Sequence, residues 1–212
     1  MMFRVFCLLL ATLLAEKCWA AEIQRVAVCS GVVLRLRGDI RDGDYARFRA
    51  HFARKETIVG LDLSSDGGDL EEGLRIANLV RRKRLTVYVG GECDSACAFV
   101  FFSAAKRYFG RHSKIGVHSV SSSRDVEDRA SMLLTVKLAR ISAKLGVPVS
   151  AIGKMVTTRP TTIAYLDGAD LSALHASAGN PFGSEPEKAS EAGQPQQTCS
   201  SSQPGSEAPP EN

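Results

Sequence analysis

The sequence predicts an α/β fold in which helices flank a largely parallel β-sheet. Short apolar stretches of strand length alternate along the chain with segments whose apolar residues recur at helical spacing. Glycine-containing turns separate many of these segments. Strands that alternate with helices form a parallel sheet, because each helix carries the chain back to the edge where the next strand begins.

Four strands are expected, at residues 31–37, 58–63, 85–89 and 114–118. Four helices are expected, at residues 42–53, 70–82, 95–104 and 126–145, and Gly146 and Pro148 should end the last of them. The helix at 95–104 is apolar on nearly every side, so it should be fully buried. Residues 64–68 and 90–94 should be loops at the carboxyl ends of strands, where sheets of this kind bind ligands.

The N-terminus has the features of a secretory signal peptide. Arg4 precedes an apolar block at residues 5–14, which is too short to span a bilayer, since that takes about 20 residues. Cys18 and Ala20 fit the small-x-small pattern that signal peptidase recognises, so cleavage is expected after Ala20. We therefore expect a periplasmic or secreted protein; a retained N-terminal anchor is the alternative.

The remaining chain should hold one folded domain, residues 21–178, and a disordered tail, residues 179–212. The tail is rich in Pro, Ser, Glu, Gln and Gly and has few large apolar side chains to bury. A formal net charge of +4 is too small to indicate a nucleic-acid partner. The basic run at residues 81–84 should end a helix, where cations offset the helix dipole; a patch for lipid or an acidic partner is the alternative.

Two cysteines, Cys93 and Cys97, bracket the start of the predicted helix at 95–104. A separation of four residues across a helix start can bring the two Cα atoms into the usual disulfide range of about 4.4–6.8 Å. Exported proteins can keep disulfides, so a Cys93–Cys97 bond is predicted. Two buried thiols, or pairing of Cys29 with one of them, are the alternatives. The spacing is a poor metal signature, and no metal site is expected.

Three features at the predicted strand ends could carry chemistry. Gly67 and Gly68 can leave amides free to bind an oxyanion, or can form an ordinary turn. Ser95 begins a helix, where a serine is either an N-cap or a nucleophile whose oxyanion the next amide, Ala96, can stabilise. His118 ends a strand and could act as a general base or be merely structural.

This ordered set resembles the Clp protease proteolytic subunit, within the wider ClpP/crotonase fold. The matching stretches are Ser65-Asp66-Gly67-Gly68, Gly90-Gly91-Glu92-Cys93-Asp94-Ser95-Ala96 and Ile115-Gly116-Val117-His118, and the resemblance covers residues 32–174. It implies a spiral of β-β-α units, a Ser95 nucleophile and a His118 base. It also implies an oxyanion hole made by the amides of Gly67 or Gly68 and of Ala96, and assembly as a homo-oligomer.

The sequence departs from the family pattern in three places. Asp66 replaces the proline of the oxyanion turn, and Cys93 and Asp94 replace small residues before the serine. The family's third catalytic residue is an aspartate after the long helix, but the matching stretch, residues 156–160, contains no acid. Asp167 and Asp170 come later, at a helix start where aspartate is a natural cap. Loss of a triad acid can lower turnover by about 10⁴, so a weak dyad or an inactive protein is expected.

The sequence thus predicts an exported serine peptidase-like hydrolase that acts on a peptide or protein substrate without a cofactor. No ATP-dependent unfoldase is expected as a partner, because that enzyme and its ATP are cytosolic. The signal-peptide-peptidase branch of this fold shares the setting, but it uses a lysine base for which the chain offers no match. A non-catalytic periplasmic binding protein on the same fold is the alternative. Acyl-CoA chemistry is disfavoured because coenzyme A is intracellular.

Overall fold

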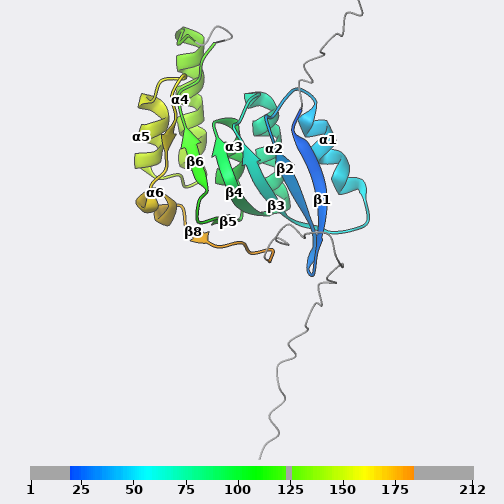
Figure 1. The fold of residues 1–212 in the computed structure, drawn as a ribbon. Coiled ribbons are helices and arrows are strands. Elements are labelled where there is room, and N and C mark those ends of the chain that lie inside the picture. The colour runs from blue at the N-terminus through cyan, green and yellow to red at the C-terminus, as the bar shows by residue number, and fades with distance from the viewer. Residues whose placement is uncertain (1–19, 123–125, 184–212) are drawn as a thin grey trace, which may run out of the picture.

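A computed structural model describes residues 20–122 and 126–183 of the chain. The predicted signal peptide, apart from Ala20, and the predicted tail beyond residue 183 lie outside the described residues. Within them, eight strands form one sheet with the order β1-β2-β3-β4-β5-β8, and β6 pairs with β4 and β7 (Figure 1). Every pairing between these strands is parallel except β1–β2 and β6–β7. The predicted α/β fold with a largely parallel sheet is confirmed.

The strands are β1 (Glu22–Val28), β2 (Gly31–Arg37), β3 (Ile58–Ser65), β4 (Thr86–Asp94), β5 (Lys106–Phe109), β6 (Lys114–Val117), β7 (Ala164–Tyr165) and β8 (Ala176–Ala178). The α-helices are α1 (Asp44–Ala50), α2 (Leu70–Lys83), α3 (Ala96–Phe102), α4 (Arg129–Lys144), α5 (Val149–Thr157) and α6 (Gly168–Ala173), and a 3₁₀ turn, η1 (His51–Ala53), extends α1. No helix among the described residues is long and apolar enough to cross a membrane.

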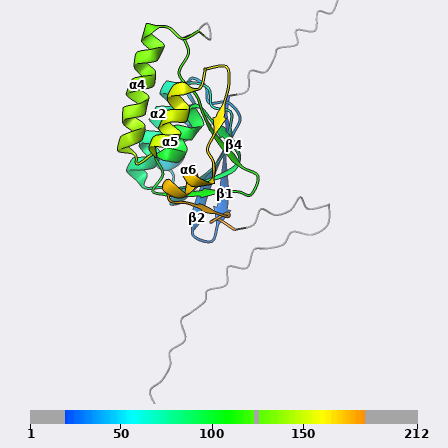
Figure 2. The ribbon, with the colours of Figure 1, turned by 90° about the vertical axis from the view of Figure 1, so that its left-hand side faces the viewer.

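The helix that carries the candidate site is buried as its composition predicts. Every residue of α3 is at most 5% exposed, and α3 packs against α2 and follows β4 directly. In the side view, α2 and α4 lie on one side of strands β1, β2 and β4 (Figure 2). The core therefore fills the space between the sheet and this helical layer, and α3 runs through its centre.

One predicted loop is wrong. Residues 90–94 are not a loop but the second half of β4, which continues to Asp94. Two different strands pair with β4 along its length: β5 beside residues 86–89 and β6 beside residues 92–94. The glycines in this stretch favoured a loop. The local sequence does not show that β6 pairs with residues 92–94 and accepts and donates the hydrogen bonds of their backbone.

The structure also contains elements that the sequence pattern did not reveal. Strand β1 is one of them: it pairs along its whole length with β2, yet none of its residues is buried. Its residues are only exposed or half-buried, so it lacks the fully buried apolar face that indicates a strand most clearly. At the other end, the Gly179 amide donates to Phe109 O at 2.9 Å, so residue 179, assigned above to the tail, still contacts the sheet.

Candidate functional site

Ser95 forms the whole connection between β4 and α3. Because β4 ends at Asp94 and α3 begins at Ala96, a single residue must turn the chain, and Ser95 does so with φ 53° and ψ −117°. A positive φ is uncommon outside glycine and marks local strain. The Ser95 side chain makes no capping hydrogen bond, although the residue occupies the N-cap position. A strained strand-to-helix turn of this kind exposes the hydroxyl of a nucleophile.

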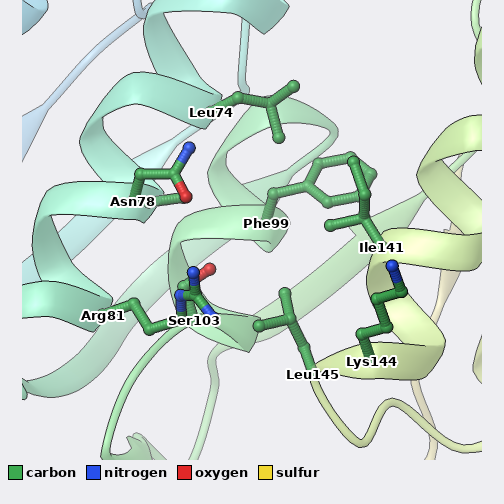
Figure 3. A pocket seen from close by; sticks show the side chains of 9 residues that line it. Leu74, Asn78, Arg81, Phe99, Ser103, Ile141, Lys144 and Leu145 are labelled. Carbon is green, nitrogen blue, oxygen red and sulfur yellow. The ribbon is translucent and has the colours of Figure 1, made fainter.

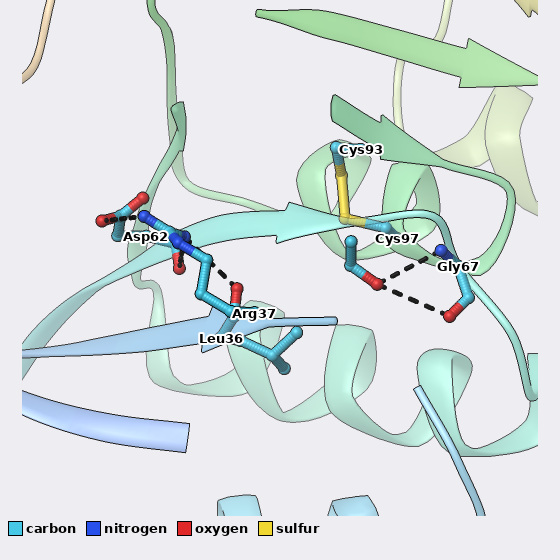
Figure 4. The surroundings of a disulfide bond; sticks show 7 residues. Leu36, Arg37, Asp62, Gly67, Cys93 and Cys97 are labelled. Carbon is cyan, nitrogen blue, oxygen red and sulfur yellow. Dashed lines mark hydrogen bonds and ion pairs between the residues drawn. A yellow bond between two sulfur atoms is a disulfide. The ribbon is translucent and has the colours of Figure 1, made fainter. Parts of the chain in front are cut away.

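The predicted disulfide is confirmed. Cys93 and Cys97 are bonded to each other, with their Cα atoms 5.1 Å apart (Figure 4). Both residues are fully buried. The bond joins the last part of β4 to the first turn of α3 and so spans the strained residue between them. The alternatives, two free thiols or a pairing of Cys29 with one of them, are excluded.

The glycine turn lies directly against Ser95. Gly67 has φ 99°, and a Cβ on it would lie 2.8 Å from the Cβ of Ser95 and 3.1 Å from the Ala96 nitrogen. The Gly67 amide donates to Ser65 Oγ at 3.2 Å. By contrast, the amides of Gly68 and Ala96 donate no hydrogen bond within the described part of the chain.

The same turn is fixed from its other side by Ile40. The Ile40 amide donates to Gly67 O at 2.6 Å, and the Asp69 amide donates to Ile40 O at 2.8 Å. A side chain on Gly68 would collide with Ile40 O, since its Cβ would lie 2.2 Å from that oxygen. Both glycines are therefore required by close backbone approach, and the turn is held in one conformation.

A cavity of about 430 Å³ brings the predicted features together. Its lining includes Gly68, Ser95 and His118, with Phe99 and Leu138 as apolar walls. Ser95 leaves the end of β4 and His118 follows the end of β6, two strands that pair side by side. Residues that are far apart in the sequence thus face one space because parallel strands end at the same edge.

The His118 ring is oriented by a backbone carbonyl. Its Nδ1 lies 2.7 Å from Ser119 O. A carbonyl oxygen only accepts hydrogen bonds, so Nδ1 carries a proton, and Nε2 is the acceptor in the neutral form of the ring. That tautomer is the one a general base requires. No direct hydrogen bond joins the Ser95 hydroxyl to the His118 ring, both of which the structure describes; such bonds are often long before substrate binds.

Among the described residues, no carboxylate takes the place of the carbonyl behind His118. The stretch matched to the family's aspartate does lie there: Thr158 O accepts from the Ser119 amide at 2.9 Å. That stretch contains no acid. Asp167 and Asp170 instead lie at the start of α6, where Asp167 caps the helix as predicted, and both pair with Lys154.

One acid that no sequence motif marks does approach this segment. Glu127 accepts a hydrogen bond from the Ser119 hydroxyl. It precedes the long helix α4, whereas the family pattern directs attention to the residues after that helix. Glu127 contacts Ser119, the residue after His118, and not the imidazole. It therefore stabilises the loop that carries His118.

Three carboxylates gather near the Ser95 turn. One oxygen each from Asp66, Glu92 and Asp94 lies within 4.8 Å of the others, so the group could hold a cation. Lys114 Nζ already lies 2.8 Å from Glu92 Oε1 and supplies positive charge. Burial, and then repulsion from Glu92 and Asp66, raises the pKa of Asp94 to about 6.

A second cavity, of about 240 Å³, lies between α2, α3 and α4 (Figure 3). Leu74, Ile141 and Leu145 give it apolar walls, and Arg81, from the basic run at the end of α2, also lines it. Phe99 contributes to both cavities. An apolar group bound in either cavity would therefore contact the helix that begins next to Ser95.

Comparison with solved structures identifies the fold. The chain is similar to ClpP1 from Listeria monocytogenes, with a TM-score of 0.53 and 16% identity over 70% of this chain and 91% of that one. It is equally similar to a point mutant of ClpP1 from Listeria monocytogenes, with a TM-score of 0.53 and 13% identity over 70% and 92% of the two chains. No protein-family model and no curated protein sequence matches this chain. The chain therefore has a ClpP-like fold.

Proposed function

We propose that this protein is an exported hydrolase that cleaves peptide or other acyl bonds through Ser95 and His118. The observation that carries the proposal is one cavity lined by the Ser95 turn, His118 and Gly68, whose amide has no acceptor among the described residues. The ClpP-like fold of the structural neighbours supports a peptidase-like activity by analogy.

In this mechanism the Ser95 hydroxyl attacks the carbonyl carbon of the substrate, and His118 Nε2 accepts its proton. The negative charge that develops on the carbonyl oxygen is stabilised by the amides of Gly68 and Ala96. Gly67 contributes its small size instead of its amide, because that amide already donates to Ser65 Oγ. His118 then returns the proton to the leaving amine, and water releases the acyl group by the reverse path.

The Ser119 carbonyl orients His118 but carries no full negative charge. It can stabilise the protonated ring less than an aspartate would, so turnover should be slow compared with a full triad. The activity would be that of a Ser-His dyad. It needs neither a cofactor nor an ATP-dependent unfoldase.

The test is labelling with a fluorophosphonate probe followed by peptide mapping. Wild-type protein should form an adduct on Ser95, and both S95A and H118Q should lose it. S103A is the matched control, because Ser103 lies at the other end of the same helix and lines the second cavity. The absence of an adduct on Ser95, under conditions that label a control hydrolase, would reject the proposal.

A non-catalytic binding protein on the same fold is the second candidate. Two observations favour it: no acid of the described chain lies behind His118, and no hydrogen bond connects Ser95 with the ring. On this alternative, S95A leaves the physiological phenotype intact while a variant that fills the cavity, such as S95W, abolishes it. Loss of the phenotype in a stably folded S95A would reject this second candidate.

We also propose that the protein acts in the periplasm or is secreted after cleavage behind Ala20.

We further propose that the protein forms homo-oligomers. Exposed apolar side chains on α4 support an assembly: Met132, Leu133 and Val136 are 60%, 63% and 45% exposed. Light scattering of the purified protein tests it. A monomer at all concentrations would reject the assembly without affecting the hydrolase.

A further inference from the structure

The start of the described chain is buried at the residue that signal-peptide cleavage would make the N-terminus. Ala21 has no exposed surface, whereas Ala20, one residue before it, is exposed. The Ala21 nitrogen lies 3.2 Å from Asp44 Oδ2, and this carboxylate has no exposed surface either. A buried nitrogen and a buried carboxylate thus meet where the peptide bond to Ala20 would be cut.

We propose that maturation creates an ion pair at this place: the α-ammonium of Ala21, freed by cleavage after Ala20, pairs with the carboxylate of Asp44. Water hydrolyses the Ala20–Ala21 bond, Ala20 keeps the new carboxylate and departs with the leader, and the new amine on Ala21 takes up a proton. An α-amino group is largely protonated at neutral pH, since its ordinary pKa is about 7.7–8.0. This inference rests on the export and cleavage proposed above, but not on the hydrolase activity.

The environment of Asp44 is built to hold a cation. The Arg41 amide donates to Asp44 Oδ2 at 2.9 Å. The Arg47 guanidinium pairs with Asp44 Oδ1 and also donates to the Ala21 carbonyl at 2.8 Å. Arg47 is about half exposed, with 48% of its side chain accessible, and is a weak counter-charge for a carboxylate that is wholly buried. An ammonium in place of the Ala21 amide adds a second, desolvated positive charge to the same carboxylate.

The gain comes from charge more than from the number of contacts. Before cleavage, an uncharged amide of Ala21 donates to the Asp44 carboxylate. After cleavage, the same nitrogen carries a positive charge, so Coulomb attraction between two opposite charges in a desolvated place is added to the hydrogen bond. In the longer chain the Asp44 carboxylate is paired with the half-exposed Arg47 guanidinium and lacks the buried ammonium beside it. The mature chain should therefore be more stable than a chain whose amino group lies one residue earlier.

The ion pair also bears on the candidate site. Asp44 fixes the Arg41 amide, and the adjacent Ile40 holds both sides of the glycine turn through Gly67 O and the Asp69 amide. The short segment 40–44 thus connects the new N-terminus to the turn beside Ser95. Maturation would tighten the segment against which that turn is fixed.

The experiment compares two chains that differ by a single residue at the N-terminus, 21–212 and 20–212, each made without any other added residue. Both carry an α-ammonium and have the same net charge, but in the longer chain that charge lies on exposed Ala20. Urea unfolding at pH 7 should give an unfolding equilibrium constant that is lower by at least about tenfold for 21–212. The two chains unfolding alike would overturn the inference.

Asp44→Asn in both lengths completes a double-mutant cycle, and it should remove most of the difference between them. Asp42→Asn is the matched control: this aspartate is exposed, lies two residues away, and should leave the difference unchanged. If Asp44→Asn fails to fold, the comparison of the two wild-type lengths still decides the question. A difference that survives in Asp44→Asn would count against Asp44 as the partner.

A second measurement follows the amine itself. An acylating reagent at neutral pH should label the α-amine of 20–212 readily and that of 21–212 slowly. The exported protein should begin at Ala21 by mass spectrometry of its N-terminal peptide. A different first residue would overturn this inference while leaving the hydrolase open, and loss of probe labelling at Ser95 would reject the hydrolase while leaving the ion pair open.

Discussion

Gly67 and Ser95 are in close contact: a methyl group on Gly67 would lie 2.8 Å from the Ser95 Cβ and 2.6 Å from Asp94 O. No side chain larger than hydrogen fits between the glycine turn and the strained turn beside it. Gly68, the next residue, lines the same cavity as Ser95. The close contact makes Gly67 a sensitive point of the site.

Gly67→Ala should therefore both destabilise the protein and reduce labelling of Ser95. The positive φ of 99° costs alanine roughly 1–2 kcal/mol, and the collision with Asp94 O adds to that cost. Thermal unfolding and probe labelling measure the two effects. Gly146→Ala is the matched control, since Gly146 has φ 78° but no atom within 4 Å of the position that a methyl group would take. Equal losses in both variants would contradict the contact.

Removal of the Cys93–Cys97 bond should loosen the Ser95 turn. The double variant Cys93→Ala/Cys97→Ala should lose about 2 kcal/mol of unfolding free energy, the value expected for so short a loop. It should also react more slowly with the probe, because Ser95 is no longer held in its strained conformation. Urea unfolding and labelling rates check both points. Unchanged labelling would show that packing of α3 alone maintains the turn.

The buried carboxylate of Asp94 should give stability an unusual pH dependence. Its pKa is raised to about 6, so the folded state holds this proton more tightly than the unfolded state, whose value is near 3.8. Its contribution to stability is therefore fully present below pH 3.8 and is lost as the pH rises through about 6. Relative to wild type, Asp94→Asn should lack this fall and gain stability as the pH rises through that window.

Urea unfolding in the presence of EDTA measures this effect, because a cation bound by Asp66, Glu92 and Asp94 would change the titration. Glu71→Gln is the control, since the Glu71 side chain is 75% exposed. Parallel pH profiles for wild type and Asp94→Asn would rule out the raised pKa.

Arg107 should be a strong stability determinant far from the site. Its guanidinium donates to Phe102 O at 2.6 Å, Leu174 O at 3.0 Å and Leu145 O at 3.4 Å, at the ends of three helices. Arg107→Lys cannot reach all three carbonyls and should lose roughly 3 kcal/mol of unfolding free energy. The exposed Arg111→Lys should change little. A small loss at Arg107, measured by urea unfolding, would mean that water replaces the guanidinium.

The order of the central elements, from β2 to α4 apart from β5, was predictable from the sequence, and the candidate site residues could be nominated from it. A nearly all-apolar run of residues indicated the buried helix α3, and turn residues indicated the glycine turn before α2. Two glycines, a serine and a histidine were recognisable because each follows a predicted strand. These residues lie close together in space because parallel pairing places the carboxyl ends of the strands along one edge of the sheet.

Only the tertiary structure decided which atoms meet. The Gly67 amide donates to Ser65 Oγ, whereas the Gly68 amide has no acceptor in the described chain. Nδ1 of His118 lies against the carbonyl of Ser119 and not against a carboxylate. These outcomes depend on φ and ψ at single residues and on segments that arrive from far along the chain, which no local pattern encodes. The sequence by itself determined the α/β fold, the disulfide pair and the candidate residues; the packing of distant segments determined the geometry in which they could act.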